Sequence, residues 1–223
     1  KYDVKRGLRY SDGRGVLVGL TRIGDVVGYE IDSTGKKVAV PGRLIYRGYN
    51  VEDIVRDTER RHQFGYEQCV YLLLFGELPT QRQLDEFTSF LGTLRTLPPN
   101  FTEDMIMKAP SSDIMNKIAR GVLASYSYDP DPENRDIANI LRQCVELISR
   151  FSTLAAYGYQ AKRRYYDGKS MYIHNPVPTL STAENFLRLI RSDKSYTRLE
   201  AEVLDLALIL HAEHGGGNNS SLT

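Results

Sequence analysis

The longest helical pattern in the chain, IANILRQCVELISRFSTLA at residues 137–155, decides the fold class. Its apolar side chains recur at spacings of three and four: Ile137, Ile140, Leu141, Cys144, Leu147, Ile148, Phe151, Leu154 and Ala155. Over about five turns, that spacing places them on one face of an α-helix. We therefore predict one long amphipathic helix, from about Arg135 to Tyr159, in a mainly α-helical protein.

Shorter helical segments surround this pattern from Asn50 onward. Residues 66–75 read as a helix that ends at Gly76, because glycine favours the position after a helix and Pro79 follows. Ile114, Ile118, Val122 and Leu123 share a helical face. Three Ser/Thr-x-x-Glu/Gln patterns predict capping boxes: Thr80 with Gln83, Ser181 with Glu184, and Thr197 with Glu200. The last of these opens a helix that runs to His211.

The first part of the chain has a different pattern. Short runs rich in β-branched and aromatic residues occupy positions 15–20, 26–31, 37–40 and 44–47. Asp32-Ser-Thr-Gly35 separates two of them as a turn. We predict a small antiparallel β element here, and a division into a β-rich segment 1–49 and a helical part 50–223.

Composition excludes several classes of function. The 223 residues carry 29 Lys and Arg against 28 Asp and Glu, so the formal charge of +1 offers no global field for nucleic acid or an anionic membrane. No apolar run reaches the ~20 residues that span a bilayer. Cys69 and Cys144 form neither a disulfide framework nor a metal motif, which favours a reducing, cytoplasmic compartment.

The segment from His211 to Thr223 has the most chemical character. His211 and His214 lie three positions apart at a helix end, three glycines follow, and Asn218 adds hydrogen-bonding groups. Imidazole donors beside a flexible backbone suit a small anionic substrate. An ordinary helix end, with histidines near its C-terminus and a glycine cap, explains the same pattern. The zinc-protease spacing of histidines at i and i+4 is absent, so we predict no metal.

Several separate stretches together resemble the citrate synthase family, in the family's order. They are residues 15–21 (GVLVGLT), 46–53 (YRGYNVED), 71–80 (YLLLFGELPT), 180–186 (LSTAENF) and 208–214 (LILHAEH), with Asn218. The resemblance implies a mainly α, multi-helical large domain, a small domain, and a homodimer. We expect the long helix near residues 135–159 to form the dimer interface, although its pattern fits packing within one subunit equally well.

The reaction that the resemblance implies belongs to the acyltransferases. Acetyl-CoA, oxaloacetate and water give citrate and CoA, a step of the tricarboxylic acid cycle, with no cofactor besides the CoA substrate. His214 matches the histidine that hydrogen-bonds oxaloacetate, and Asn218 matches the asparagine of that pocket. This assignment is chemically reasonable, because a dianionic keto acid is bound by hydrogen-bond donors around its oxygens.

The remaining machinery of the family is absent from residues 1–223. The Gly-Pro-x-His-Gly and Gly-x-Gly-His histidines, the catalytic aspartate and the substrate-binding arginines are expected beyond Thr223. We therefore expect the chain to be truncated before the small domain and inactive by itself. Two alternatives stay open: a 2-methylcitrate synthase that uses propionyl-CoA, and a non-catalytic helical binding or assembly module.

Overall fold

A computed structural model describes residues 21–213 of the chain. The chain forms two compact units: residues up to Thr80 together with those from Asp205 on, and residues Gln81–Leu204. The predicted class is confirmed, because helices predominate and the strands form one small antiparallel sheet, in the order β1-β2-β3. Within residues 21–213, no helix combines the length and apolar character that a membrane span requires.

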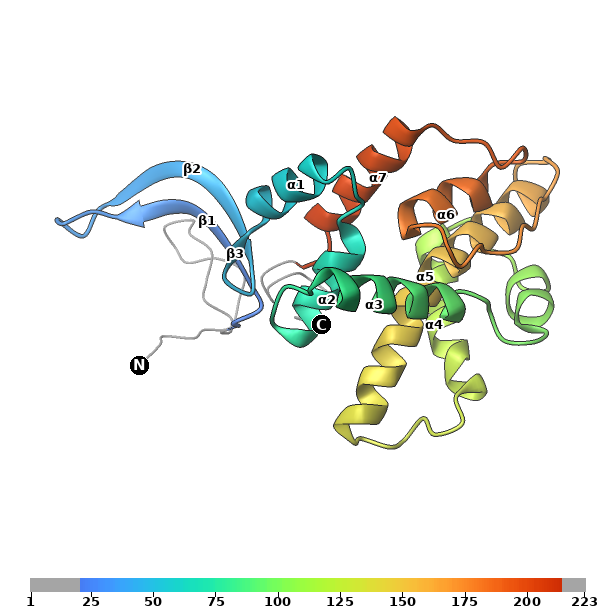
Figure 1. Cartoon of the computed structure of the whole chain (residues 1–223). Coiled ribbons are helices and arrows are strands. Elements are labelled where there is room, and N and C mark those ends of the chain that lie inside the picture. The colour runs from blue at the N-terminus through green and yellow to red at the C-terminus, as the bar shows by residue number, and fades with distance from the viewer. Residues whose placement is uncertain (1–20, 214–223) are drawn as a thin grey trace. The chain divides into compact units, whose positions relative to one another are not determined.

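A long hairpin opens the first unit (Figure 1). β1 (Gly24–Ile31) pairs antiparallel with β2 (Lys37–Tyr46). The predicted turn is confirmed: the Asp32 carboxylate accepts the N–H groups of Thr34 and Lys36, each at 2.9 Å. Those bonds close the tight connection that the strand pairing requires.

One strand prediction is wrong, because residues 37–40 and 44–47 do not form separate strands. β2 runs continuously through Pro41 and Gly42 and ends at Tyr46. The strand register slips there: Val27 faces Arg43 and Tyr29 faces Ala39, so Gly28 stands opposite three residues of β2. This bulge accommodates a proline, which has no N–H for the ladder. The run predicted at 15–20 lies outside the described residues.

The segment after β2 turns sharply into the first helix. Arg47 and Gly48, with φ of 49° and 87°, form a two-residue turn, after which Tyr49 pairs with Tyr46. Positive φ at both positions is the type I′ geometry that suits tight hairpins. β3 (Tyr49–Asn50) ends in the N-cap of α1 (Val51–Arg60), where the Asn50 side chain accepts the Glu52 N–H at 3.2 Å.

The core of the first unit lies where the sheet meets its helices. α2 (Tyr66–Phe75) ends, as predicted, at Gly76, whose φ is 84°. Both α1 and α2 contact β2. The buried apolar cluster consists of Tyr46, Val51, Ile54, Cys69, Leu72 and Ile209.

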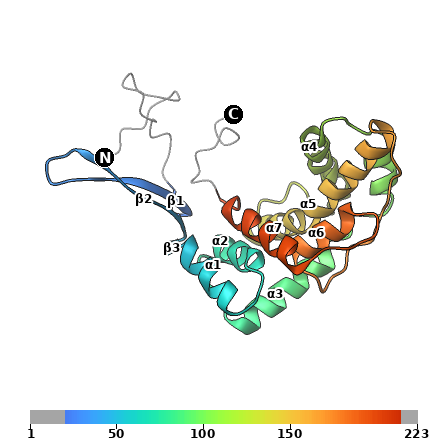
Figure 2. The same cartoon turned by 90° about the horizontal axis from the view of Figure 1, so that it is seen from above.

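The second unit is built on α5 (Ile137–Tyr165), the predicted long helix. It extends past the predicted end at Tyr159. α3, α4 and α6 pack against it (Figure 2). The remaining helical elements of this unit are α3 (Gln81–Leu94), the π-helix η1 (Thr102–Met107), α4 (Ile114–Ser125), the 3₁₀ turn η2 (Tyr126–Tyr128), α6 (Thr182–Ile190) and the beginning of α7 (Arg198–Leu210).

The faces predicted for α5 and α4 are only partly the buried ones. Ile137 and Phe151 on α5 are 86% and 48% exposed, and Leu123 on α4 is 76% exposed. In their place Ser149 and Lys117 are buried. Ser149 donates a hydrogen bond to the Leu91 carbonyl, and the Lys117 ammonium donates to the carbonyls of Met105 and Ala109. Polar side chains with partners on neighbouring segments therefore occupy positions that the apolar pattern could not indicate.

Two predicted capping boxes are present in full. Ser181 and Glu184 exchange hydrogen bonds of 2.9 and 3.2 Å at the start of α6, and Thr197 and Glu200 exchange bonds of 2.7 and 3.2 Å at the start of α7. Arg191 adds two bonds to the Glu200 carboxylate, at 3.0 and 2.6 Å. Together these contacts hold the pKa of Glu200 at about 2.

Candidate functional site

The site predicted from sequence follows the C-terminal end of α7. After Leu210, the N–H groups of His211 and Ala212 donate to the carbonyls of Ala207 and Ile209, each at 3.2 Å. The Nδ1 atom of the exposed His211 ring lies 2.7 Å from the Ala207 carbonyl oxygen, and donates to it in the tautomer that protonates Nδ1. His211 thus caps the helix.

Tyr46, at the end of β2, also holds this helix end. Its side chain is fully buried, and its hydroxyl donates to the Ile209 carbonyl at 2.8 Å. The same oxygen accepts the N–H of Glu213 at 3.3 Å and lies 3.4 Å from the Glu213 carbonyl oxygen. A hydroxyl can donate and accept at once, so the Tyr46 oxygen binds the Ile209 carbonyl and the Glu213 N–H together.

Asp205 connects α7 to the start of α2. Its carboxylate accepts the N–H of Gly65 at 2.7 Å and the N–H of Tyr66 at 3.2 Å. The first turn of a helix has unpaired N–H groups and a partial positive charge, so a buried carboxylate is stabilised there. The helix end that precedes the predicted site is therefore held from two sides, by β2 and by α2.

Burial keeps two ionisable side chains near this helix end, Cys69 and Tyr66, in their neutral forms. Burial, followed by the nearby charges of Asp205 and Glu67, raises the pKa of the Cys69 thiol to about 12. Burial also raises the pKa of Tyr66 to about 12. A thiol with such a pKa is not a nucleophile near neutral pH.

The predicted substrate-binding residues, His214 and Asn218, lie outside the described residues. The described chain reaches Glu213, the residue before His214. Sequence reasoning missed the supporting residues Tyr46 and Asp205. A signal existed for Asp205, since it interrupts the apolar run from Val203 to Leu210, and an acid inside a buried helix face needs a partner.

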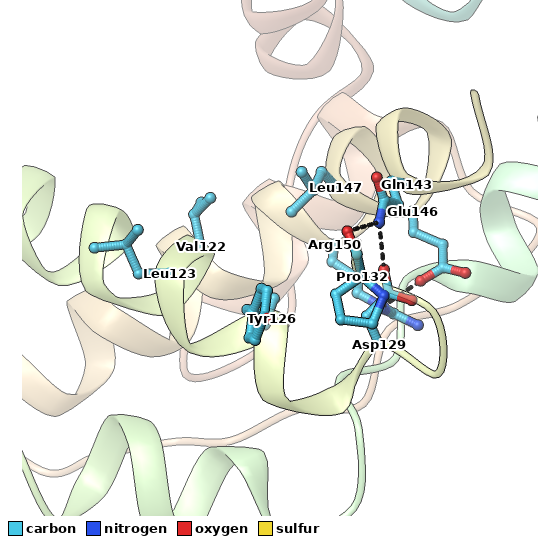
Figure 3. Close-up of a pocket in the computed structure, with 10 residues that line it drawn as sticks. Val122, Leu123, Tyr126, Asp129, Pro132, Gln143, Glu146, Leu147 and Arg150 are labelled. Atoms are coloured by element: carbon cyan, nitrogen blue, oxygen red, sulfur yellow. Dashed lines mark hydrogen bonds and ion pairs between the residues drawn. The ribbon is translucent and has the colours of Figure 1, made fainter. Parts of the chain in front are cut away.

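A cavity of about 300 Å³ lies in the second unit, where α4, η2 and α5 meet (Figure 3). Val122, Leu123 and Leu147 give it an apolar side. Its polar side is partly paired internally: Gln143 donates to Asp129 at 2.9 Å, and the Arg150 Nη1 atom pairs with Glu146 at 2.8 Å. The buried Nε of Arg150 has no hydrogen-bond partner among the described residues. These pairs occupy much of the hydrogen-bonding capacity that a ligand would need.

Metal chemistry has no visible site in the part of the chain that the structure describes. No three histidine, cysteine, aspartate or glutamate side chains there come together to hold an ion. Cys69 and Cys144 are both free thiols.

Comparisons with known proteins agree on one family. A model of the family described as citrate synthase, C-terminal domain, matches residues 8–223. A citrate synthase of Saccharolobus solfataricus is 30% identical over 173 residues, which are 78% of this chain and 42% of the relative. A citrate synthase of Haloferax volcanii is 30% identical over 218 residues, covering 96% of this chain and 50% of the relative.

The fold comparison gives the same result. The crystal structure of citrate synthase from Pyrobaculum aerophilum superposes with a TM-score of 0.72 at 26% identity, covering 97% of this chain and 52% of that one. The chain spans about half the length, or less, of the curated relatives it matches.

Proposed function

Because the chain belongs to the citrate synthase family, we propose that its protein condenses acetyl-CoA with oxaloacetate and water, giving citrate and CoA. The observation that carries the proposal is the extent of the match, which takes in residues 8–223. In this reaction the thioester methyl loses a proton, the resulting carbon attacks the keto carbonyl, and water then cleaves the thioester. The protein acts as an acyltransferase of the tricarboxylic acid cycle, in the cytoplasm.

In this proposal, His214 and Asn218 bind oxaloacetate. Hydrogen-bond donors on the keto oxygen stabilise the alkoxide that forms as the new carbon–carbon bond closes. The described chain reaches Glu213, whose N–H donates to the Tyr46 hydroxyl at 3.3 Å.

The proposal includes a homodimer. Its support is the apolar surface on two neighbouring helices: Ile137 and Phe151 on α5, and Met115 and Leu123 on α4, are exposed within the described chain. Large apolar side chains that are exposed on two helices in contact favour burial against another surface. Light scattering of the purified protein tests this part, and a monomer at micromolar concentration contradicts it.

The activity is tested on the protein as its gene encodes it. Release of CoA is followed with oxaloacetate and either acetyl-CoA or propionyl-CoA. We expect faster turnover with acetyl-CoA; a preference for propionyl-CoA makes the protein a 2-methylcitrate synthase, and no release with either thioester refutes the proposal. The same assay is also run on residues 1–223 produced alone. We expect this shorter chain to be inactive.

Two matched substitutions test the site. His214→Gln should lower kcat by about 100-fold or more, the usual loss when one donor to a developing oxyanion is removed. His211→Gln is the control three positions earlier, because the His211 ring bonds the backbone carbonyl of Ala207. Equal activity of the two variants contradicts the role of His214.

A further inference from the structure

We propose that the C-terminal end of α5 is a docking surface for an acidic segment of another protein. This α5-end surface consists of Arg163, Arg164, Tyr165, Tyr166, Lys169 and Tyr172. The inference goes beyond the proposed condensation reaction. Phe151, on the apolar surface proposed for the dimer, lies about 20 Å along the helix from Tyr165, so the two surfaces are separate.

The first step is the distribution of charge. Residues 162–169 (KRRYYDGK) contain four cations and one carboxylate, which give a net charge of +3. The whole chain has a formal charge of +1, so the remaining residues together carry −2, which is +1 minus +3. Positive charge is therefore concentrated at this helix end, where it attracts an acidic surface and orients it during encounter.

The second step is that other groups already cap this helix end. Cations near a helix C-terminus commonly serve its free carbonyls. Here the Lys162 ammonium pairs with Asp167 at 2.9 Å, and the Arg163 carbonyl accepts the N–H of Lys169 at 2.9 Å. The side chains of Arg164 and Lys169 are exposed and form no hydrogen bond or ion pair within residues 21–213. They are therefore available to a partner.

The third step is the ordered backbone beneath the surface. Gly168 has a φ of 65°, a conformation that favours glycine, and the chain turns back there so that the Lys169 N–H reaches the Arg163 carbonyl. The N–H of Tyr172 donates to Oε1 of Gln160, a buried residue of α5, at 3.1 Å. A surface whose backbone is already ordered loses less conformational entropy when a partner binds.

The fourth step is the tyrosines, which favour a protein as the partner. Tyr165, Tyr166 and Tyr172 are 52%, 53% and 39% exposed. Tyrosine and arginine are enriched in protein–protein interfaces, because a rigid ring buries a large area while its hydroxyl still forms hydrogen bonds. Proteins that bind duplex DNA commonly contact about six to ten phosphates. Within residues 21–213, the α5-end surface has three cations without an ion-pair partner, which is too few.

A peptide-binding measurement tests the proposal on the protein as its gene encodes it. The probe is a fluorescein-labelled peptide of alternating glutamate and glycine, and binding is followed by fluorescence anisotropy. We expect saturable binding that weakens between about 50 and 200 mM salt, because salt screens charges at an exposed surface. The double variant Arg164→Gln, Lys169→Gln should bind the peptide about tenfold more weakly, since it loses two ion pairs with the partner.

The matched control removes the same charge from other places. It combines Lys36→Gln, in the β1–β2 turn, with Arg135→Gln, before the opposite end of α5; both side chains are exposed. This control should bind within about twofold of the wild type. Equal weakening in the two double variants, or no binding by the wild type, overturns the proposal. Tighter binding of an oligothymidylate of the same length also overturns it, because the surface then selects nucleic acid.

Carbodiimide cross-linking locates the bound peptide in the wild-type protein without any substitution. The reagent joins glutamate carboxylates to amines that they contact, and mass spectrometry identifies the lysines. We expect cross-links at Lys169 in preference to Lys36, which is equally exposed to the reagent. Cross-links at both lysines in similar yield overturn the proposal, because they show that the peptide binds without preference for the α5-end surface.

Discussion

Substitution of Gly92 by alanine gives the sharpest test of the packing in the second unit. A Cβ at Gly92, on α3, would lie 2.1 Å from the carbonyl oxygen of Pro178 and 2.9 Å from its carbon. Ordinary contact begins near 3.4 Å, so the Pro178 backbone would have to move by about 1.3 Å. The obstacle is backbone, which has no rotamer to change.

The loop around Pro178 resists that movement because Arg95 holds both of its sides. The buried guanidinium donates to the Val177 carbonyl at 3.1 Å and to the Leu180 carbonyl at 2.5 Å. Overpacking costs about 1–3 kcal/mol, and loss of one bond to a charged donor about 1.5–3 kcal/mol. Alanine regains about 1 kcal/mol of helix propensity. We therefore expect Gly92→Ala to destabilise the second unit by about 1.5–5 kcal/mol.

The assay is urea denaturation followed by far-UV circular dichroism, with hydrogen exchange to assign the loss to residues 81–204. Gly42→Ala is the control, because a Cβ there meets nothing within 4 Å, and its change should stay within about 1 kcal/mol. The packing argument fails if Gly92→Ala is as stable as Gly42→Ala.

Three further predictions use buried or charged groups. Asp205→Asn should lower the free energy of unfolding by about 1–2 kcal/mol, because the charged acceptor at the start of α2 is lost. Hydrogen exchange of the Gly65 amide should become faster in this variant, and an unchanged exchange rate argues against the cap. Glu200 has a folded pKa of about 2 against 4.5 in the unfolded chain, so its pairing with Arg191 stabilises the fold above pH 4.5 and is lost as the pH falls toward 2. The melting temperature of Glu200→Gln should accordingly lie below that of the wild type at neutral pH and converge with it in acid, and a constant difference is the contrary result. Cys69, buried and with a pKa of about 12, should react with Ellman's reagent only after unfolding in urea; rapid labelling of the native protein disproves its burial.

The features that could be predicted from sequence are those with local partners. The capping boxes at Ser181 and Thr197 join residues three positions apart, and Gly76 marks a helix end through its own backbone. The apolar repeat of α5 likewise needs no distant information. These patterns gave the class, the long helix and the turn at Asp32.

The features that could not be predicted have partners far away in the chain. Arg95 is buried because carbonyls 82 and 85 positions later accept from it, and Tyr46 reaches across 163 positions to Ile209. No periodicity encodes such pairs. The candidate site shows the same division: His214 and Asn218 stand in a local motif, while Tyr46 and Asp205, which hold the helix before them, emerge from the fold.

The discontinuity of the first unit has a consequence for synthesis on the ribosome. Its two parts, up to Thr80 and from Asp205 on, are separated by the 124 residues of Gln81–Leu204. At about 5–20 residues per second, the early part waits roughly 6–25 s for its complement to be translated. Tyr46 and Gly65 emerge long before Ile209 and Asp205, so the inserted unit has time to fold first. A chaperone that shields the nascent hairpin and α2 should therefore raise the yield more than one that acts after release.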